Sequence, residues 1–285
     1  MNSILNDMIK DYDLKQDSEV NIAKEIMQKI CLSALSRTDF FTKIAFMGGT
    51  SLRLFYGLDR FSEDLDFTFI KPNDNFDFSS YFNIIKSEFT SLGIEVNIVQ
   101  KKKTNQSEVL DAYVSAPTST FFKALFGESK IKSFNKSELL KVKIEVDTKL
   151  LNSQVITHKS ILTPYPCNIT LFDLPTIFAG KIHACLLRNW KHRVKGRDFY
   201  DYVYLLSHHA KPNMEFLKEK LINSGVIKAK DAFTIEQLKS MLYEKFKQVD
   251  FQLAKDDVIE FINDKRKIEI WSSEFFYDIT EQYLK

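Results

Sequence analysis

The chain has 285 residues, which is enough for about two ordinary domains or one large one. Hydrophobic residues make up 44% and charged residues 27%, the balance of a soluble globular protein with a sizeable core. The formal net charge of only +2 excludes a global attraction to nucleic acid, so any such binding must rest on a local patch.

Cysteine usage and the N-terminal segment indicate where the protein works. Cys31, Cys167 and Cys185 are widely spaced and show no CxxC pairing, which argues against a disulfide framework or a zinc knuckle. The first twenty residues carry acidic side chains and no sustained apolar run, unlike a signal peptide. The sequence has no run of eighteen apolar residues, so we expect no transmembrane helix and no membrane partner. We expect a cytoplasmic protein.

The first part of the chain mixes helical and strand patterns. Ile22, Ile26 and Ile30 recur at helical spacing and predict a helix within residues 1–38. A short apolar strand, a glycine pair and a helix of one or two turns follow, ending at Gly57. Further downstream the patterns predict a helix at 81–92 and strands at 65–70, 94–100, 107–116 and 141–148.

From about Pro164 onward the pattern is helical, and we expect no strand there. The helical segments are 174–190, 196–209, 213–224, 234–248 and 256–264. The sequence therefore predicts an α/β (α+β) fold. A catalytic domain at residues 1–160, with a mixed β-sheet flanked by helices, is followed by an all-helical C-terminal domain at 161–285.

Gly48 and Gly49 lie between the first predicted strand and the short helix. Glycine permits a positive φ and close approach of another group, and the amides of a turn that begins a helix attract anions. Thr50 and Ser51 add hydroxyl donors, so one interpretation is a phosphate cradle. The other is a tight turn capped by Thr50, which these residues alone favour. The lysine of a P-loop is missing.

Asp64 and Asp66 are two residues apart in a predicted strand, so both carboxylates point to the same face. Like charges this close raise each other's pKa, a cost that a divalent cation removes. Carboxylate oxygens suit Mg²⁺, with Mn²⁺ as the alternative. The competing interpretation is a solvent-facing acidic strand edge, but the apolar neighbours Leu65 and Phe67 favour a buried strand with an acidic end.

A two-metal site needs a third carboxylate, and the strand at 141–148 offers two. Val142, Ile144 and Val146 alternate with Lys143, Glu145 and Asp147. Since Glu145 and Asp147 share a face, periodicity does not separate them.

The stretch GGTSLRLFYGLDRFSEDLDF, residues 48–67, resembles the signature of DNA polymerase beta-like nucleotidyltransferases. Within that superfamily, GGTxL followed by RxSxDxDF resembles the AbiEii/AbiGii toxin family. Its second block, K-apolar-E, is matched at 143–145, which favours Glu145 over Asp147. The third and fourth blocks, KxxA…R and RDxxD, are matched by Lys181, Ala184 and Arg188, and by Arg197, Asp198 and Asp201. The four blocks occur in order within residues 46–206, and the chain beyond about 210 is unmatched.

The resemblance implies a Mg-dependent nucleotidyltransferase that moves a nucleoside monophosphate from an NTP to an acceptor hydroxyl. It also implies the toxin half of a toxin–antitoxin or phage-defence system, with a cognate antitoxin as a partner. The implied site consists of metal ligands Asp64, Asp66 and Glu145, catalytic residues Lys181 and Asp198, and nucleotide-binding residues Gly48, Gly49, Thr50, Ser51, Ser62 and Lys181.

Two of these residues have plainer interpretations. A lysine in the middle of a helix, such as Lys181, is usually a surface residue that extends its amine to water. Asp198 can cap its own helix or place a negative charge near the helix N-terminus.

The acceptor is suggested by a basic segment at 188–197. Its cationic groups are Arg188, Lys191, His192, Arg193, Lys195 and Arg197, with Trp190 among them. Such a cluster can bind a polynucleotide backbone, and a tryptophan can stack on a base. The alternative is a solvated loop between helices. Because some relatives extend the 3′ end of tRNA, the resemblance favours an RNA acceptor, while a protein hydroxyl or a small molecule stays open.

Two other classes of function stay open as well. The same fold can transfer the γ-phosphate, as a kinase does, or act as a non-catalytic module that binds a nucleotide or a partner. The sequence patterns do not indicate the preferred NTP or the oligomeric state.

Overall fold

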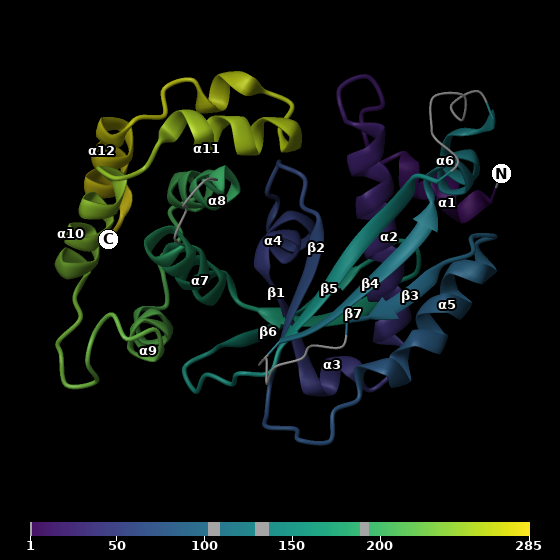
Figure 1. The fold of residues 1–285 in the computed structure, drawn as a ribbon, viewed down its shortest axis with the longest axis horizontal. Helices are drawn as coiled ribbons and strands as arrows, with labels where there is room; N and C mark the ends of the chain where they lie inside the picture. The colour runs from purple at the N-terminus through teal and green to yellow at the C-terminus, as the bar shows by residue number, and fades with distance from the viewer. Residues whose placement is uncertain (1, 102–108, 129–136, 189–193) are drawn as a thin grey trace. The chain divides into compact units, whose positions relative to one another are not determined.

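The computed structural model describes residues 2–101, 109–128, 137–188 and 194–285 (Figure 1). Two compact units emerge from the contacts within the chain. The first comprises residues 1–55, 61–150 and 156–171, and the second comprises 56–60, 151–155 and 172–285. Each unit therefore combines segments that are distant in the sequence.

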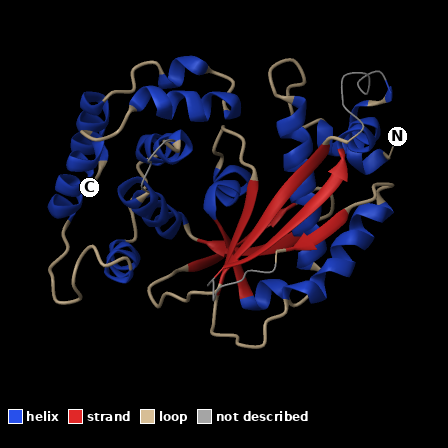
Figure 2. Ribbon diagram, viewed as in Figure 1, coloured by secondary structure: helices blue, strands red, loops and turns tan. Residues whose placement is uncertain are grey.

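The first unit contains a seven-stranded sheet with helices packed against it. Its elements are α1 (Ser3–Ile9), α2 (Glu19–Ser36), α3 (Phe40–Lys43), β1 (Ile44–Met47), α4 (Gly48–Tyr56), β2 (Asp64–Phe69), η1 (Phe78–Tyr81), α5 (Phe82–Ser91), β3 (Asn97–Gln100), β4 (Val109–Pro117), α6 (Thr118–Phe126), β5 (Leu139–Asp147), β6 (Ile156–Ile161) and β7 (Cys167–Phe172). The strand order is β3-β4-β5-β2-β1-β7-β6. Figure 2 shows the strands in red and the helices in blue.

The sheet is mixed, as predicted. β2 pairs antiparallel with β1 and parallel with β5, while β4 pairs antiparallel with both β3 and β5. β1 and β7 are parallel. The register places Asp66 beside Met47 of β1 and beside Glu145 of β5. The α/β fold class inferred from the sequence is confirmed.

The two faces of the sheet differ because side chains alternate along each strand. Leu65 and Phe67 of β2 are paired with Ile144 and Val146 of β5, and all four side chains are buried. Helix α2, buried along most of its length, packs against β5. Burying one such side chain contributes about 1.5–3 kcal/mol. The apolar face therefore anchors β2 and β5 and leaves their charged residues on the opposite face.

Strands β6 and β7 were not predicted, and the expectation of only helices after about Pro164 is wrong for β7. β6 is last in the strand order, so it has one neighbouring strand, and its sequence ITHKSI is largely polar and exposed. β7 is a run of six residues, four of them buried. Neither segment has the long alternation on which the sequence prediction relied.

The described residues after β7 form helices, as expected. They are α7 (Leu174–Leu187), α8 (Gly196–Ser207), α9 (Met214–Asn223), α10 (Ile235–Phe246), α11 (Phe251–Val258), η3 (Ile259–Phe261), η4 (Lys265–Ile268) and α12 (Ser273–Tyr283). α12 was not predicted, and α11 begins five residues before the expected segment. Among the described helices, none combines the length and apolar character needed to cross a membrane.

An aromatic cluster forms the core of these helices. The ring of Phe276 from α12 stacks on Phe251 of α11 with centroids 4.7 Å apart, and Phe199 of α8 meets it edge-on at 5.4 Å. All three side chains are buried. Many of the chain's phenylalanines are thus explained by packing, since aromatic pairs add specific geometry to a large buried area.

Candidate active site

The glycine pair begins helix α4 immediately after β1, and Gly48 has a φ of +81°. A Cβ atom on Gly48 would lie 2.1 Å from Oδ2 of Asp66 and 2.9 Å from its Cβ and Cγ. Glycine is therefore needed at position 48 for two reasons, the backbone conformation and the approach of the Asp66 side chain. The glycine pair and the aspartate pair noted in the sequence therefore lie in direct contact in the structure.

Thr50 and Ser51 are fully buried and use their hydroxyls inside the protein. The Thr50 hydroxyl donates to the backbone carbonyl of Asp64, and the Ser51 hydroxyl donates to the carbonyl of Gly48 at 3.0 Å. These bonds hold the start of α4 against the start of β2. The backbone amides at the start of α4 are therefore the remaining candidates for binding a phosphate at this turn.

The register of three neighbouring strands gathers carboxylates on one face of the sheet. Asp66 of β2 is beside Glu145 of β5, which in turn is beside Asp111 of β4. Asp64 shares the Asp66 face of β2 because the two residues are two positions apart. Neighbouring strands are about 4.8 Å apart, so these side chains are close neighbours. Asp64, Asp66 and Glu145 are partly exposed, whereas Asp111 is 6% exposed.

Asp111 was not among the predicted site residues. The alternation of residues 107–116 marks it as facing the same way as Tyr113, but not as facing Glu145. That neighbour relation depends on the pairing of β4 with β5, two strands that are separated in sequence by helix α6.

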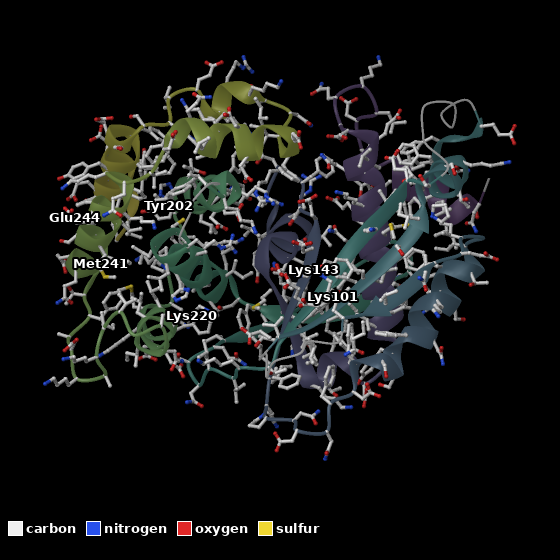
Figure 3. The ribbon with its side chains drawn as sticks, in the orientation of Figure 1. Lys101, Lys143, Tyr202, Lys220, Met241 and Glu244 are labelled. Atoms are coloured by element: carbon white, nitrogen blue, oxygen red, sulfur yellow. The ribbon has the colours of Figure 1, made fainter. Side chains whose placement is uncertain are left out.

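Lys143, labelled in Figure 3, contributes a positive charge on this face. Its Nζ atom is 2.5 Å from Oε1 of Glu145 and 3.8 Å from Oδ2 of Asp111. Burial alone would lower the pKa of the Lys143 ammonium, but the hydrogen bond to Glu145 and the charges of Glu145 and Asp111 raise the pKa above its usual range. Lys143 thus balances two of the carboxylates.

The donor set on this face suits a hard divalent cation, because Asp64, Asp66 and Glu145 all offer carboxylate oxygens. In the arrangement observed, no group of three His, Cys, Asp or Glu side chains among the described residues is placed to hold a metal ion. Glu145 is hydrogen-bonded to Lys143 instead. A role for Glu145 as a metal ligand would therefore compete with its hydrogen bond to Lys143. The metal role of the three residues stays a prediction.

Ser62 precedes β2 by two residues and is partly exposed. Its backbone carbonyl accepts a hydrogen bond of 3.0 Å from Nε2 of Gln28 in α2. This bond fixes the backbone at the entry to β2, and a role for the Ser62 hydroxyl in phosphate binding stays a prediction.

The second unit contains a buried ion cluster centred on Asp201 of α8. Arg60 donates two hydrogen bonds of 2.7 Å to the carboxylate, and Nζ of Lys181 lies 2.7 Å from Oδ2. Burial alone would raise the pKa of Asp201, but the charges of Arg60 and Lys181 hold it below its usual range. Lys181 is therefore not the surface lysine of the plainer interpretation: its side chain is 12% exposed and ion-paired.

Asp198 has a different partner. Its Oδ2 accepts a hydrogen bond of 2.7 Å from Nη1 of Arg188, and its carboxylate is almost fully buried. The carboxylate in contact with Lys181 is that of Asp201, which follows Asp198 in the same RDxxD block. Asp198 lies in the first turn of α8 but does not cap it, since the cap residue is Lys195. The catalytic role assigned to Asp198 stays a prediction.

The basic segment 188–197 is only partly described, because Trp190, Lys191, His192 and Arg193 lie outside the described residues. Of the rest, Arg197 is 8% exposed, and its guanidinium lies over the Phe261 ring at 4.2 Å. This contact is typical of a packing role. Arg188 is exposed, and its guanidinium is paired with Asp198.

Two solved structures from Helicobacter pylori resemble the whole chain. The protein JHP933 is 20% identical with a TM-score of 0.50, covering 93% of this chain and 92% of its own. A proposed nucleotidyltransferase is 21% identical with a TM-score of 0.54, covering 94% and 96%. At these identities the likeness shows the fold.

The family follows from the sequence. The model of the family described as "Nucleotidyl transferase AbiEii toxin, Type IV TA system" matches residues 30–278, and the chain belongs to this family. The resemblance inferred from the four sequence blocks is thus confirmed, and the match extends beyond residue 210. No protein of curated function matches the chain.

Proposed function

We propose that this protein is the toxin of a type IV toxin–antitoxin pair and transfers a nucleoside monophosphate from an NTP to a hydroxyl of RNA in the cytoplasm, with Mg²⁺ or Mn²⁺ as cofactor. The observation that carries the proposal is the close approach of Asp66 to Gly48, together with its register beside Glu145. This geometry ties the start of a helix to an acidic strand face. A cognate antitoxin is the expected partner.

The transfer forms a bond between the acceptor oxygen and the α-phosphorus and breaks the bond from that phosphorus to the bridging oxygen of pyrophosphate. Asp64 and Asp66 on β2, with Glu145 on β5, would hold divalent cations, which would supply neutralisation of the triphosphate and easier ionisation of the acceptor hydroxyl. The absence of a Cβ at Gly48 leaves room for the Asp66 carboxylate. Lys143 then faces Asp111 and balances its charge.

For Lys181 and Asp198 the support is the family resemblance. Lys181 is proposed to bind triphosphate oxygens as a point charge, which an ammonium does well. Asp201 restricts the lysine side chain, since the pair is buried. Asp198 holds Arg188, and through it the start of the basic segment. Each role is tested by replacing the residue.

The test is an incubation of the protein with Mg²⁺, total tRNA and each α-³²P-labelled NTP in turn. Asp66→Ala is the inactive variant, and Asp74→Ala, which replaces an exposed aspartate in a loop, is the matched control. We expect label on RNA with the wild type and with Asp74→Ala, but not with Asp66→Ala. If no NTP labels RNA, the RNA acceptor is refuted, and γ-labelled NTP then tests phosphoryl transfer of the kinase type.

A further inference from the structure

The second unit contains a cavity of about 440 Å³ that the proposed function does not use. It is lined by Gly57, Asp59, Tyr200, Val203, Tyr204, Ser207, His208, Lys267 and Trp271. One wall is a face of α8, another is the segment 56–60, and the third is the region from η4 to Trp271. A volume of this size accommodates a small molecule with one or two rings.

Aromatic rings make up much of the lining. Tyr204 of α8 and His208, the residue that caps the end of this helix, have ring centroids 4.1 Å apart with planes inclined by 33°. Tyr200 packs beside Trp271 with centroids 6.3 Å apart. Rings of this kind bind flat π-systems through their faces and edges. The cavity is therefore suited to a planar ring.

The hydroxyl groups of three lining residues are already used within the protein. The Tyr200 hydroxyl donates to Oδ1 of Asp59 at 2.8 Å, and the Tyr204 hydroxyl donates to the backbone carbonyl of Tyr56 at 2.6 Å. The Ser207 hydroxyl donates to the carbonyl of Tyr204. A ligand rich in hydroxyls, such as a sugar, would need these donors and acceptors. A flat ring can instead pack against the accessible rings of Tyr204 and His208, beside the buried rings of Tyr200 and Trp271.

Positive charge accompanies the aromatic lining. Lys267 is ion-paired with Asp59, and its side chain is 50% exposed. It is the last of three consecutive cations on η4, after Lys265 and Arg266. An exposed ammonium in a pair with one carboxylate can also contact a phosphate, because such pairs are weak in water. A flat ring with an attached anionic group fits both features.

We propose that this cavity binds a nucleotide, with the base among Tyr200, Tyr204, His208 and Trp271 and the phosphate near Lys267. The choice of a nucleotide among flat anions rests on the proposed function. Two sources share this chemistry, namely a free nucleotide and an unpaired nucleotide of RNA. Base stacking on aromatic side chains serves both.

The test uses the fact that the chain has two tryptophans, Trp190 and Trp271. Trp190→Phe leaves Trp271 as the only tryptophan, and its fluorescence is followed during titration with nucleoside monophosphates, a short single-stranded oligoribonucleotide and ribose 5-phosphate, all without metal. Calorimetry on the same samples measures binding that does not change the fluorescence. We expect saturable binding of nucleotides and none of ribose 5-phosphate.

Ser207→Phe fills the cavity from an exposed position on α8 and should weaken nucleotide binding about tenfold or more. The matched control is Ser240→Phe, since Ser240 is also exposed on a helix and also donates to a backbone carbonyl. Lys267→Ala should weaken the binding of nucleotides more than the binding of the corresponding nucleosides, which are titrated in parallel. Tighter binding of the oligoribonucleotide assigns the cavity to RNA, and tighter binding of mononucleotides assigns it to free nucleotide.

The proposal is overturned if ribose 5-phosphate binds as well as nucleotides, if no nucleotide binds by either measurement, or if Ser207→Phe binds as tightly as Ser240→Phe. Its failure is separable from that of the proposed function. Binding in this cavity without label transfer by the wild type would refute the transfer alone, and transfer without binding here would refute the cavity assignment alone.

Discussion

The acidic face of the first unit and the Asp201 cluster of the second unit handle charge in opposite ways. On the sheet face, Asp66, Glu145 and Asp111 lie beside one another on three neighbouring strands, and Lys143 contacts Glu145 and Asp111. In the cluster, one carboxylate is enclosed by two cations. Carboxylates gathered side by side raise each other's pKa and favour a bound cation, whereas a buried carboxylate enclosed by cations organises the core. The first pattern is typical of a reactive site, and the second of an anchor.

The largest effect is expected from Asp201→Ala. This change leaves Arg60 and Lys181 as buried cations without their shared carboxylate and should destabilise the protein by about 3–5 kcal/mol. Urea unfolding measures the difference, and Asp198→Ala, whose partner Arg188 is exposed, is the comparison. Equal losses of unfolding free energy in the two variants would contradict the view that Asp201 anchors the core while Asp198 forms an ordinary ion pair.

The same pair sets a pH dependence. Because the folded-state pKa of Asp201 is lowered, its contribution to stability is complete above the unfolded-state pKa of about 3.9 and is lost as the pH falls through the lower folded-state pKa. Unfolding free energies measured from pH 6 down to pH 2 should therefore fall less steeply in Asp201→Ala than in the wild type. A parallel pH profile in the variant would rule out this linkage.

Gly48→Ala should cost about 1–3 kcal/mol of stability through backbone strain, and it should reduce transfer activity more than tenfold because the new methyl group displaces the Asp66 carboxylate. Gly93→Ala is the control. Gly93 also has a positive φ, +80°, but a Cβ there meets nothing within 4 Å. If both variants lose activity equally, displacement of the Asp66 carboxylate is not the cause of the loss.

Lys143→Met should lower stability by about 1 kcal/mol in the presence of a chelator, since it leaves Glu145 and Asp111 side by side without their cation. Mg²⁺ should then raise the melting temperature more in the variant than in the wild type, because ligands that bind the folded state stabilise it. Lys141→Met, at an exposed position on the same strand, controls for loss of charge. A smaller Mg²⁺ response in Lys143→Met than in Lys141→Met would contradict the exchange of lysine for metal.

The smallest effect on stability is expected from Arg188→Ala, under about 1 kcal/mol, because the arginine is exposed. If the basic segment binds RNA, the KM for RNA should rise while the KM for the NTP stays unchanged. Steady-state kinetics with both substrates separates the two. A rise confined to the KM for the NTP would point away from an RNA contact at Arg188.

Much of the candidate site was predictable because its signals are local. Alternation along one strand placed Asp64 and Asp66 together, and the glycine pair marked the turn into α4. The partners of these residues were not predictable in the same way. The contact of Gly48 with Asp66 joins two elements, and the choice of Asp201 over Asp198 as the partner of Lys181 depends on how α7 and α8 pack.

The sequence by itself determined the fold class, the family and the faces on which the charged residues of β2 and β5 lie, because side-chain alternation and short motifs depend only on neighbouring residues. The tertiary structure alone decided that Asp111 joins the acidic face, that Lys143 bonds Glu145, and that β6 and β7 complete the sheet. The physical reason is that strand pairing and ion pairing bring together residues far apart in the chain, and the energy of these contacts exists only once the chain has folded.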